Sequence, residues 1–189
     1  MTQLGLFTVP DEGPTGLRYT DNFIEPAVEQ GLIGRIAALP LERFQFGAFE
    51  GNRRVASFGY RYDYTLQRLA EAEPIPDWLV PIARQAEAWA ELPEASVRQV
   101  LCTEYEAGVG IGWHRDKPHF DKILGLSLGS ACRFRFRRRR EDGWQRHTLE
   151  ALPRSLYMMD GEARSQWEHS IPPVEARRYS ITFRTMHRA

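Results

Sequence analysis

The 189-residue sequence predicts a mainly β protein with flanking helices (α+β), in which an N-terminal helical layer packs on a C-terminal β-core. Two observations carry this prediction. Apolar residues recur with helical periodicity in two segments before Pro93, and after Pro93 apolar and polar residues alternate with a period of two. Turn residues separate the alternating stretches, which is typical of a sandwich, a barrel or a jelly roll.

The N-terminal half predicts one strand and two helices. Residues 1–15 are rich in Gly and Pro and predict an extended arm, and residues 16–24 predict a strand. Residues 25–39 predict a helix with Pro26 in its first turn, and a second helix follows residues 75–77 and stops at Pro93. The apolar positions expected along the helices are Val28, Leu32, Ile33 and Ile36 in the first and Leu79, Ile82, Ala83, Ala86, Trp89 and Ala90 in the second.

The C-terminal half, residues 97–186, predicts the β-core. No repeats occur, and no linker is long enough to divide two domains, so we expect residues 1–189 to form a single domain. The expected strands are 97–108, 122–130, 132–138, 146–152, 154–161 and 177–185.

Composition restricts the class of protein. Lys plus Arg and Asp plus Glu number 25 each, so the net charge implies no polyanionic partner. Cys102 and Cys132 give no sequence reason to pair, which fits a reducing compartment. The N-terminus lacks a basic signal-peptide region, and no segment approaches the roughly 18 apolar residues of a membrane span. We therefore expect a cytoplasmic protein without a membrane partner.

The stretch GIGWHRDKPHF, residues 110–120, suggests a metal site. In an extended segment His114 and Asp116 project to the same side and Arg115 to the other. His169, in the later stretch WEHSIPP, offers a third ligand. Two histidines and one carboxylate form the facial triad of non-haem Fe(II) oxygenases, which leaves one side of the metal open. The His-x-Asp pair alone is weak evidence, and His114 taken by itself fits a structural use better.

The last expected strand, RYSITFR, separates a polar face from an apolar one. Two arginines inside a β-core are costly to desolvate without an anion, and a metal-bound dicarboxylate would supply one that guanidinium binds bidentately. The alternative is a surface strand whose arginines face water. The polar face carries Arg178, Ser180, Thr182 and Arg184, and the apolar face carries Tyr179, Ile181 and Phe183.

Taken together, these motifs resemble the AlkB family of Fe(II)/2-oxoglutarate-dependent dioxygenases. The resemblance covers residues 90–186 most clearly, and the N-terminal part only loosely. It implies a double-stranded β-helix (jelly-roll) core, with Fe(II), 2-oxoglutarate and O2 as cofactor and cosubstrates. The motifs are Y-x-x-G-x-x-I-G-W-H-x-D (105–116) in loose form, S-L-G-S (127–130), W-x-H-S-I-P (167–172) and R-x5-R (178–184).

The resemblance also implies roles for individual residues. Arg178 would pair with the distal carboxylate of 2-oxoglutarate, helped by Tyr105, and Arg184 would lie near the metal-proximal carboxylate and the Asp ligand. Ser180 and Thr103 stand where other members carry asparagine, so the polar surroundings of the cosubstrate differ. The residues implied to bind Fe(II) and to carry catalysis are His114, Asp116 and His169.

The implied activity is oxidative demethylation of alkylated bases, such as 1-methyladenine or 3-methylcytosine in DNA or RNA, with release of succinate, CO2 and formaldehyde. Residues 43–66 resemble a nucleotide-recognition lid, whose cations would meet phosphates and whose aromatic rings would stack on an extruded base. Trp113 is a further aromatic candidate, although core packing explains it as well. The lid candidates are Asn52, Arg53, Arg54, Phe58, Tyr60 and Tyr62.

The stretch RFRFRRRR, residues 133–140, suggests a second basic surface. Arg133, Arg135 and Arg137 alternate with two phenylalanines, so one face of the strand is basic and the other apolar. Residues 138–140 would continue into a turn whose basic tip follows a phosphate backbone with salt-dependent affinity. The alternative is a solvated strand, partly neutralised by the acidic residues at 141–142.

We therefore expect a monomer that acts on single-stranded DNA or RNA without an obligate protein partner. One alternative is the same iron chemistry on tRNA nucleosides, on protein or on a small molecule. The other is a catalytically silent jelly roll that binds nucleic acid without metal. The remaining histidines, which we expect to be structural or on the surface, are His119, His147 and His187.

Overall fold

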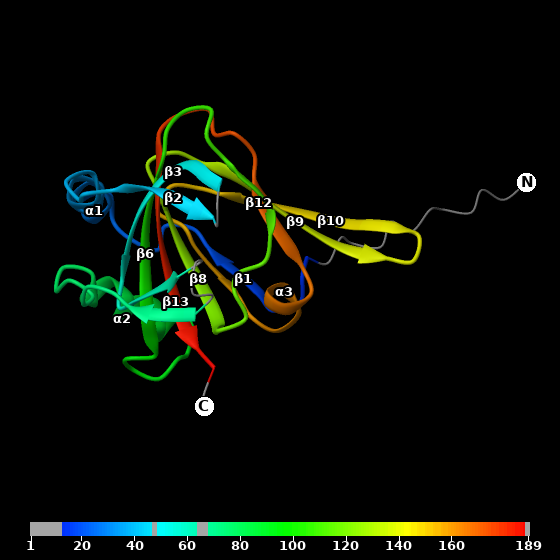
Figure 1. Ribbon diagram of the computed structural model, residues 1–189, viewed down its shortest axis with the longest axis horizontal. Coiled ribbons are helices and arrows are strands. Elements are labelled where there is room, and N and C mark those ends of the chain that lie inside the picture. Colours follow the sequence, from blue (N-terminus) through cyan, green and yellow to red (C-terminus); the bar gives the residue numbers. More distant parts are fainter. Residues whose placement is uncertain (1–12, 47–48, 64–67, 188–189) are drawn as a thin grey trace, which may run out of the picture.

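A computed structural model of the chain describes residues 13–46, 49–63 and 68–187. Two antiparallel sheets face each other, as the jelly-roll prediction requires, and a short hairpin of β4 and β5 lies beside them (Figure 1). Residues 1–12 of the expected arm (1–15), and residues 47–48 and 64–66 of the expected lid, lie outside the described residues.

The larger sheet carries the strands that line the site. β13 lies at its centre and pairs with β8 on one side and β6 on the other. The strands, in spatial order, are β1 (Leu17–Thr20), β11 (Leu156–Met159), β8 (Phe120–Leu128), β13 (Arg178–Met186), β6 (Val97–Tyr105), β3 (Phe49–Phe58) and β2 (Glu42–Phe46).

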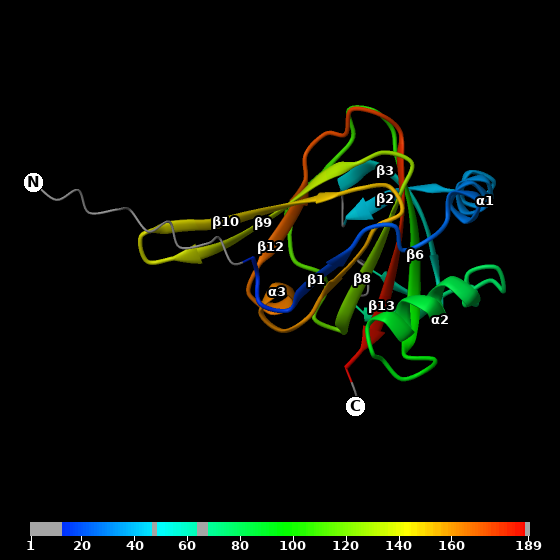
Figure 2. The ribbon, with the colours of Figure 1, turned by 180° about the vertical axis from the view of Figure 1, so that it is seen from behind.

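The smaller sheet closes the other side of the jelly roll. It contains β10 (Gly143–Ala151), β9 (Cys132–Arg140), β12 (Glu168–Ile171) and β7 (Ile111–His114), in this order. β12 pairs with β9 only from Arg135 to Arg137, so the far end of the β9–β10 hairpin projects away from the body of the molecule in both views (Figures 1 and 2).

Two helices cover the outer face of the larger sheet, on the side of the molecule opposite the projecting hairpin (Figure 2). They are α1 (Pro26–Ala37) and α2 (Val80–Trp89), each with a proline in its first turn, where a missing N–H costs nothing. Leu32 and Ile36 of α1 and Ile82 and Ala86 of α2 pack against Val100 of β6 in one buried cluster. No helix of the described chain is long and apolar enough to span a bilayer.

The apolar face predicted for α1 was wrong at one position, Val28. Val28 is 45% exposed, whereas the neighbouring Glu29 is only 7% exposed. The Glu29 carboxylate accepts a hydrogen bond from the backbone N–H of Gly129 at 2.9 Å and lies 3.9 Å from Arg154. The helix is therefore rotated so that this carboxylate caps a turn of the sheet.

The C-terminal strands follow the predicted order with shifted ends. β9 continues to Arg140, so the three arginines expected to enter the turn are still in the strand. The expected strand 154–161 is reduced to β11, because Asp160 caps a short helix, α3 (Gly161–Ser165), through the Gly161 N–H. Sequence periodicity did not predict α3, β7 or β12, which span only four or five residues each.

Candidate active site

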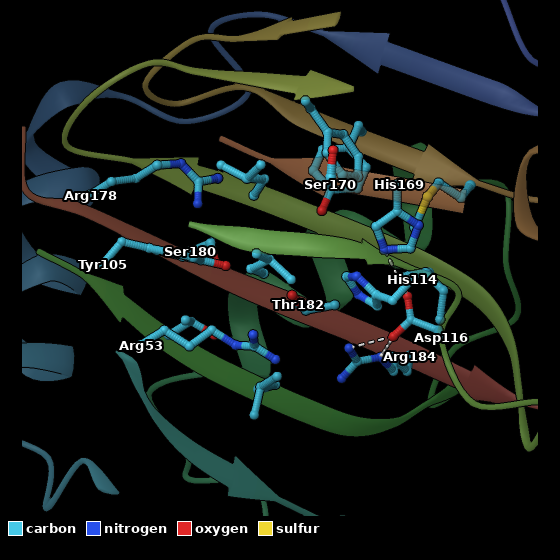
Figure 3. A pocket seen from close by; sticks show the side chains of 18 residues that line it. Arg53, Tyr105, His114, Asp116, His169, Ser170, Arg178, Ser180, Thr182 and Arg184 are labelled. Carbon is cyan, nitrogen blue, oxygen red and sulfur yellow. Dashed lines mark hydrogen bonds and ion pairs between the residues drawn. The ribbon is translucent and has the colours of Figure 1, made fainter. Parts of the chain in front are cut away.

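The short strands β7 and β12 bring the three candidate ligands together. His114 ends β7 directly opposite His169 of β12, and their rings are 4.3 Å apart. Asp116 follows β7 by two residues, and its Oδ2 lies 3.5 Å from Nε2 of His169. One ligand atom from each of the three lies within 4.8 Å of the others, as a single metal ion requires (Figure 3).

The protonation states of these ligands suit a divalent metal. The Nδ1–H of His114 donates to the Gly112 carbonyl at 2.9 Å, which leaves Nε2 unprotonated for the metal. Burial lowers the pKa of His169 to about 3, and it also lowers the pKa of His114. Burial alone would raise the pKa of Asp116, but Arg184, His169, His114 and Arg164 together outweigh burial and hold that pKa well below the usual range. At neutral pH the site therefore offers two neutral imidazoles and one carboxylate.

Arg184 orients the carboxylate of Asp116. Its Nε and Nη2 both donate to Oδ1, at 3.0 Å and 2.7 Å. The other oxygen, Oδ2, is the one that faces His169. Arg184 therefore occupies one carboxylate oxygen and leaves the second for a metal.

Arg178 is a buried cation with unpartnered donors at the other end of the pocket. It is 1% exposed, and Nη2 donates to the Ser127 hydroxyl at 3.1 Å. Its Nε and Nη1 have no hydrogen-bond partner, and no described carboxylate forms an ion pair with it. The Tyr105 ring lies 5.0 Å from the guanidinium carbon. A buried guanidinium in this state is costly unless an anion binds there.

The polar face of β13 joins the two ends of the site. Ser180 and Thr182 lie between Arg178 and Arg184 (Figure 3), and Thr103 stands opposite Ser180 on β6. These side chains line a pocket of about 530 Å³, part of it open to solvent. The donor set and the orphaned guanidinium fit Fe(II) together with a dicarboxylate such as 2-oxoglutarate. The alternative of a strand with water-facing arginines was wrong, because Arg178 is buried and Arg184 pairs with Asp116.

Comparison with known proteins agrees with this geometry. Residues 33–184 match the family described as the 2OG-Fe(II) oxygenase superfamily. The chain belongs to this superfamily. Its cofactor is therefore Fe(II), and its cosubstrates are 2-oxoglutarate and O2, with the His114–Asp116–His169 triad suited to hold the metal.

Relatives with curated descriptions confirm the resemblance of this oxygenase to the AlkB family. It is 30% identical, over 89% of its length and 51% of the relative, to the "Alkylated DNA repair protein ALKBH8 homolog" of Arabidopsis thaliana. It is 34% identical, over 65% of its length and 19% of the relative, to the mouse "tRNA (carboxymethyluridine(34)-5-O)-methyltransferase ALKBH8". The chain thus spans about half the length of the plant relative and a fifth of the mouse one.

Solved structures share the fold at low sequence identity. OsALKBH1 superposes with a TM-score of 0.70 and 17% identity, covering 92% of this chain and 97% of that one. A prolyl-4-hydroxylase from Pseudomonas putida superposes with a TM-score of 0.62 and 15% identity, covering 92% and 94%. Both support the double-stranded β-helix fold of this oxygenase.

The polar residues of the expected lid differ in where their side chains lie. Arg53 lines the pocket, and its guanidinium lies 3.7 Å from the Phe44 ring. The neighbouring Arg54 instead forms an ion pair with Glu104. Asn52 is exposed. The side chains of consecutive strand residues point to opposite faces, so only Arg53 of the two arginines reaches the site.

The aromatic residues expected to stack on a base also lie in different surroundings. Phe58 was wrongly predicted to stack on a base, because it packs in the core beneath α2. Tyr62 lies against the loop that follows Asp116, with its ring 4.5 Å from Lys117 Nζ and 5.7 Å from the His119 ring. Tyr60 is half-buried, and Trp113 packs on arginines of the smaller sheet. Arg115 is exposed, and its Nη1 donates to the Ser165 carbonyl at 3.4 Å.

Gln99 is a site residue that sequence reasoning missed. Its Oε1 accepts from Nη1 of Arg184 at 2.8 Å, and its Nε2 donates to the Ser57 hydroxyl at 3.0 Å and to the Tyr60 carbonyl at 2.8 Å. Gln99 therefore links Arg184, which holds the candidate ligand Asp116, to the junction of β3 and β4. The sequence could have indicated this role, because Gln99 lies two residues before Leu101 and therefore on the face of β6 that lines the pocket.

Replacing Gln99 with leucine is expected to lower the free energy of unfolding of the metal-free oxygenase by about 1–3 kcal/mol, because a buried donor of Arg184 loses its acceptor. Urea unfolding measures the change. Gln99→Glu keeps an acceptor for Arg184 but, like the leucine variant, loses the two hydrogen bonds that Nε2 donates, so the difference between the two variants reports the bond to Arg184. Equal stability of the leucine variant and the wild type would show that this hydrogen bond contributes nothing.

Proposed function

We propose that this oxygenase oxidatively demethylates alkylated bases, such as 1-methyladenine or 3-methylcytosine, in single-stranded DNA or RNA. The observation that carries the proposal is the position of the lid. Tyr62 stands against the loop that follows the ligand Asp116, and Arg53 lines the pocket that holds the three candidate ligands. An aromatic ring and a cation beside the metal site are what an extruded nucleotide needs for stacking and for its phosphate.

Bound Fe(II) and 2-oxoglutarate would supply oxidation of a substrate C–H bond by O2, in which 2-oxoglutarate becomes succinate and CO2. The chain would do the rest. His114, Asp116 and His169 would hold the metal, while Arg184 keeps Asp116 deprotonated and oriented. Arg178 would bind the carboxylate remote from the metal, which aligns the cosubstrate along β13.

The apolar wall of the pocket would keep water from the reacting carbon. Ile111, Ile123, Phe134 and Met159 form part of this wall. A methyl group on a base nitrogen would be hydroxylated there, and the resulting N-hydroxymethyl group would break its C–N bond to release formaldehyde and the unmodified base. The protein would position the base and exclude solvent, while the cofactor supplies the oxidation.

Mass spectrometry of a single-stranded oligonucleotide with one 1-methyladenine tests the proposal. With Fe(II), 2-oxoglutarate and ascorbate, we expect loss of the methyl group. The His114→Ala variant, tested in parallel, is expected to leave it in place. Retention of the methyl group while succinate accumulates would refute base demethylation and leave the oxygenase with another substrate.

A second candidate is oxidation of a modified nucleoside in tRNA. The name of the mouse relative favours it, since that protein is described as a tRNA (carboxymethyluridine(34)-5-O)-methyltransferase. Nucleoside mass spectrometry of total tRNA after incubation with the oxygenase tests this candidate. A modified nucleoside that changes only in the presence of 2-oxoglutarate would support it.

A further inference from the structure

We propose that the outer face of the β9–β10 hairpin is a docking surface for the single-stranded nucleic acid whose base enters the pocket. This inference deepens the proposed function and rests on it. It starts from a row of alternating arginine and tryptophan side chains, which we call the ladder. In spatial order the ladder comprises Arg135, Trp113, Arg137, Trp144 and Arg139.

The ladder is continuous from β7 to the hairpin. The distances from guanidinium carbon to ring centroid are 5.0 Å and 4.4 Å for Arg135 and Arg137 on Trp113, and 4.3 Å and 5.6 Å for Arg137 and Arg139 on Trp144. Arg137 thus lies against both rings. Each stack holds an arginine in place, so less side-chain entropy is lost when a ligand binds.

The register of the strands places further charge on this face. Residues directly opposite in an antiparallel pair project to the same side. Arg146 lies opposite Arg137, and Trp144 opposite Arg139. The acidic residues on this face are Glu168, which pairs with Arg137 at 2.7 Å, and Glu150 at the base of the hairpin. The arginines on this face are Arg133, Arg135, Arg137, Arg139 and Arg146.

The opposite face of the hairpin has a different role. Phe134 and Phe136 are buried in the cluster between the two sheets, and Arg138 is paired with Glu162 of α3. The inner face therefore anchors the hairpin, and the outer face is the one open to a partner. Trp144 is 39% exposed, and Arg139 and Arg146 are exposed.

The chemistry of the ladder favours a single strand of nucleic acid. Residues 132–151 contain no lysine, and arginine both binds phosphate bidentately and stacks on planar groups. The exposed part of the Trp144 ring can stack on an unpaired base of any identity. The chain as a whole has no net charge, so this concentration of arginine on one projecting hairpin is local.

The ladder also meets the active site. Trp113, its first ring, immediately precedes His114 in β7, and the two side chains point to opposite faces of the same edge strand. A strand that delivers one base to the pocket would pass this edge. Its flanking nucleotides would then cross the ladder toward the tip of the hairpin.

Binding of a labelled, unmodified single-stranded oligonucleotide, followed by fluorescence anisotropy at several salt concentrations, tests the inference. The double variant Arg139→Glu/Arg146→Glu is expected to bind about tenfold more weakly or worse. Its slope of log affinity against log salt is expected to be smaller by about 1.4, the value for two lost contacts to a single strand. Trp144→Ala is expected to weaken binding about fivefold or more, and Trp144→Phe to restore most of it.

The matched control is Arg35→Glu/Arg98→Glu, which makes the same change in charge. Arg98 is an exposed residue of β6 in the larger sheet. Arg35 lies on α1 against Trp78, 5.8 Å from its ring, so it forms an arginine–tryptophan pair on the far side of the molecule. This control is expected to bind like the wild type. Circular dichroism of every variant verifies that it is folded.

The outcomes separate this inference from the proposed function. Wild-type affinity in the hairpin variants would overturn the docking surface, and demethylation of 1-methyladenine would still stand by its own assay. Ladder-dependent binding without oxidation of any base would uphold the surface and refute the demethylase. Equal weakening by the control pair, or a preference for duplex over single strand, would also overturn the surface as proposed.

Discussion

Replacing His114 with alanine is expected to abolish 2-oxoglutarate turnover and to weaken Fe(II) binding by more than about a hundredfold. Loss of a residue that merely supports a metal ligand costs about 10–100-fold, and His114 is itself a candidate ligand. Its ring lies 4.3 Å from that of His169, and one of its ring nitrogens lies within 4.8 Å of a ligand atom of each of the other two residues. Fe(II) titration of the metal-free protein and succinate formation measure the two effects.

His187→Ala is the matched control for this variant. His187 is the last described residue, 63% exposed in its side chain, and lies 3.7 Å from Asp121 rather than near the ligands. It is expected to bind Fe(II) like the wild type. The His114 variant is also expected to keep its affinity for oligonucleotide. Substantial succinate formation by the His114 variant would mean that the metal lies elsewhere.

Replacing Arg178 with methionine is expected to raise the 2-oxoglutarate concentration needed for half-maximal turnover by about a hundredfold or more. Removing one partner of a buried charge pair costs about 3–5 kcal/mol. Fe(II) binding is expected to persist, since Arg178 contacts none of the three ligands. The metal-free variant is expected to be at least as stable as the wild type, because the substitution removes buried donors that have no partner.

Arg177→Met is the control for the Arg178 variant. Arg177 precedes Arg178 in the chain, but its side chain is 60% exposed and lies 3.5 Å from Glu106. We expect this control to leave the 2-oxoglutarate requirement unchanged. An Arg178 variant with the wild-type requirement would refute the assignment of this residue to the cosubstrate, whatever its stability.

The parts of the fold that the sequence predicted are those with long, regular patterns. RYSITFR alternates over its whole length, and β13 presents Arg178 and Arg184 on the pocket side with Phe183 in the core. The three ligands were predicted because a metal site restricts residue type and local spacing. β12, which carries His169, was too short for periodicity to identify it.

Other features depend on packing between distant segments, which no local pattern encodes. From the sequence, Phe58 is predicted to be one of several aromatic lid residues, and only the pairing of β3 with β6 places it in the core. Glu29 is buried because a turn of the sheet needs a hydrogen-bond acceptor. Gln99 becomes a link between Arg184 and the lid only when β6 lies between β3 and β13.

In the proposed function, one iron site couples 2-oxoglutarate oxidation to removal of a methyl group from a base. Simultaneous measurement of succinate and formaldehyde, with a single-stranded oligonucleotide carrying 1-methyladenine, tests it most directly. We predict that the two products form in equal amounts and that both require Fe(II) and O2. Demethylation without succinate, or succinate without formaldehyde at any concentration of the methylated strand, would contradict the claim.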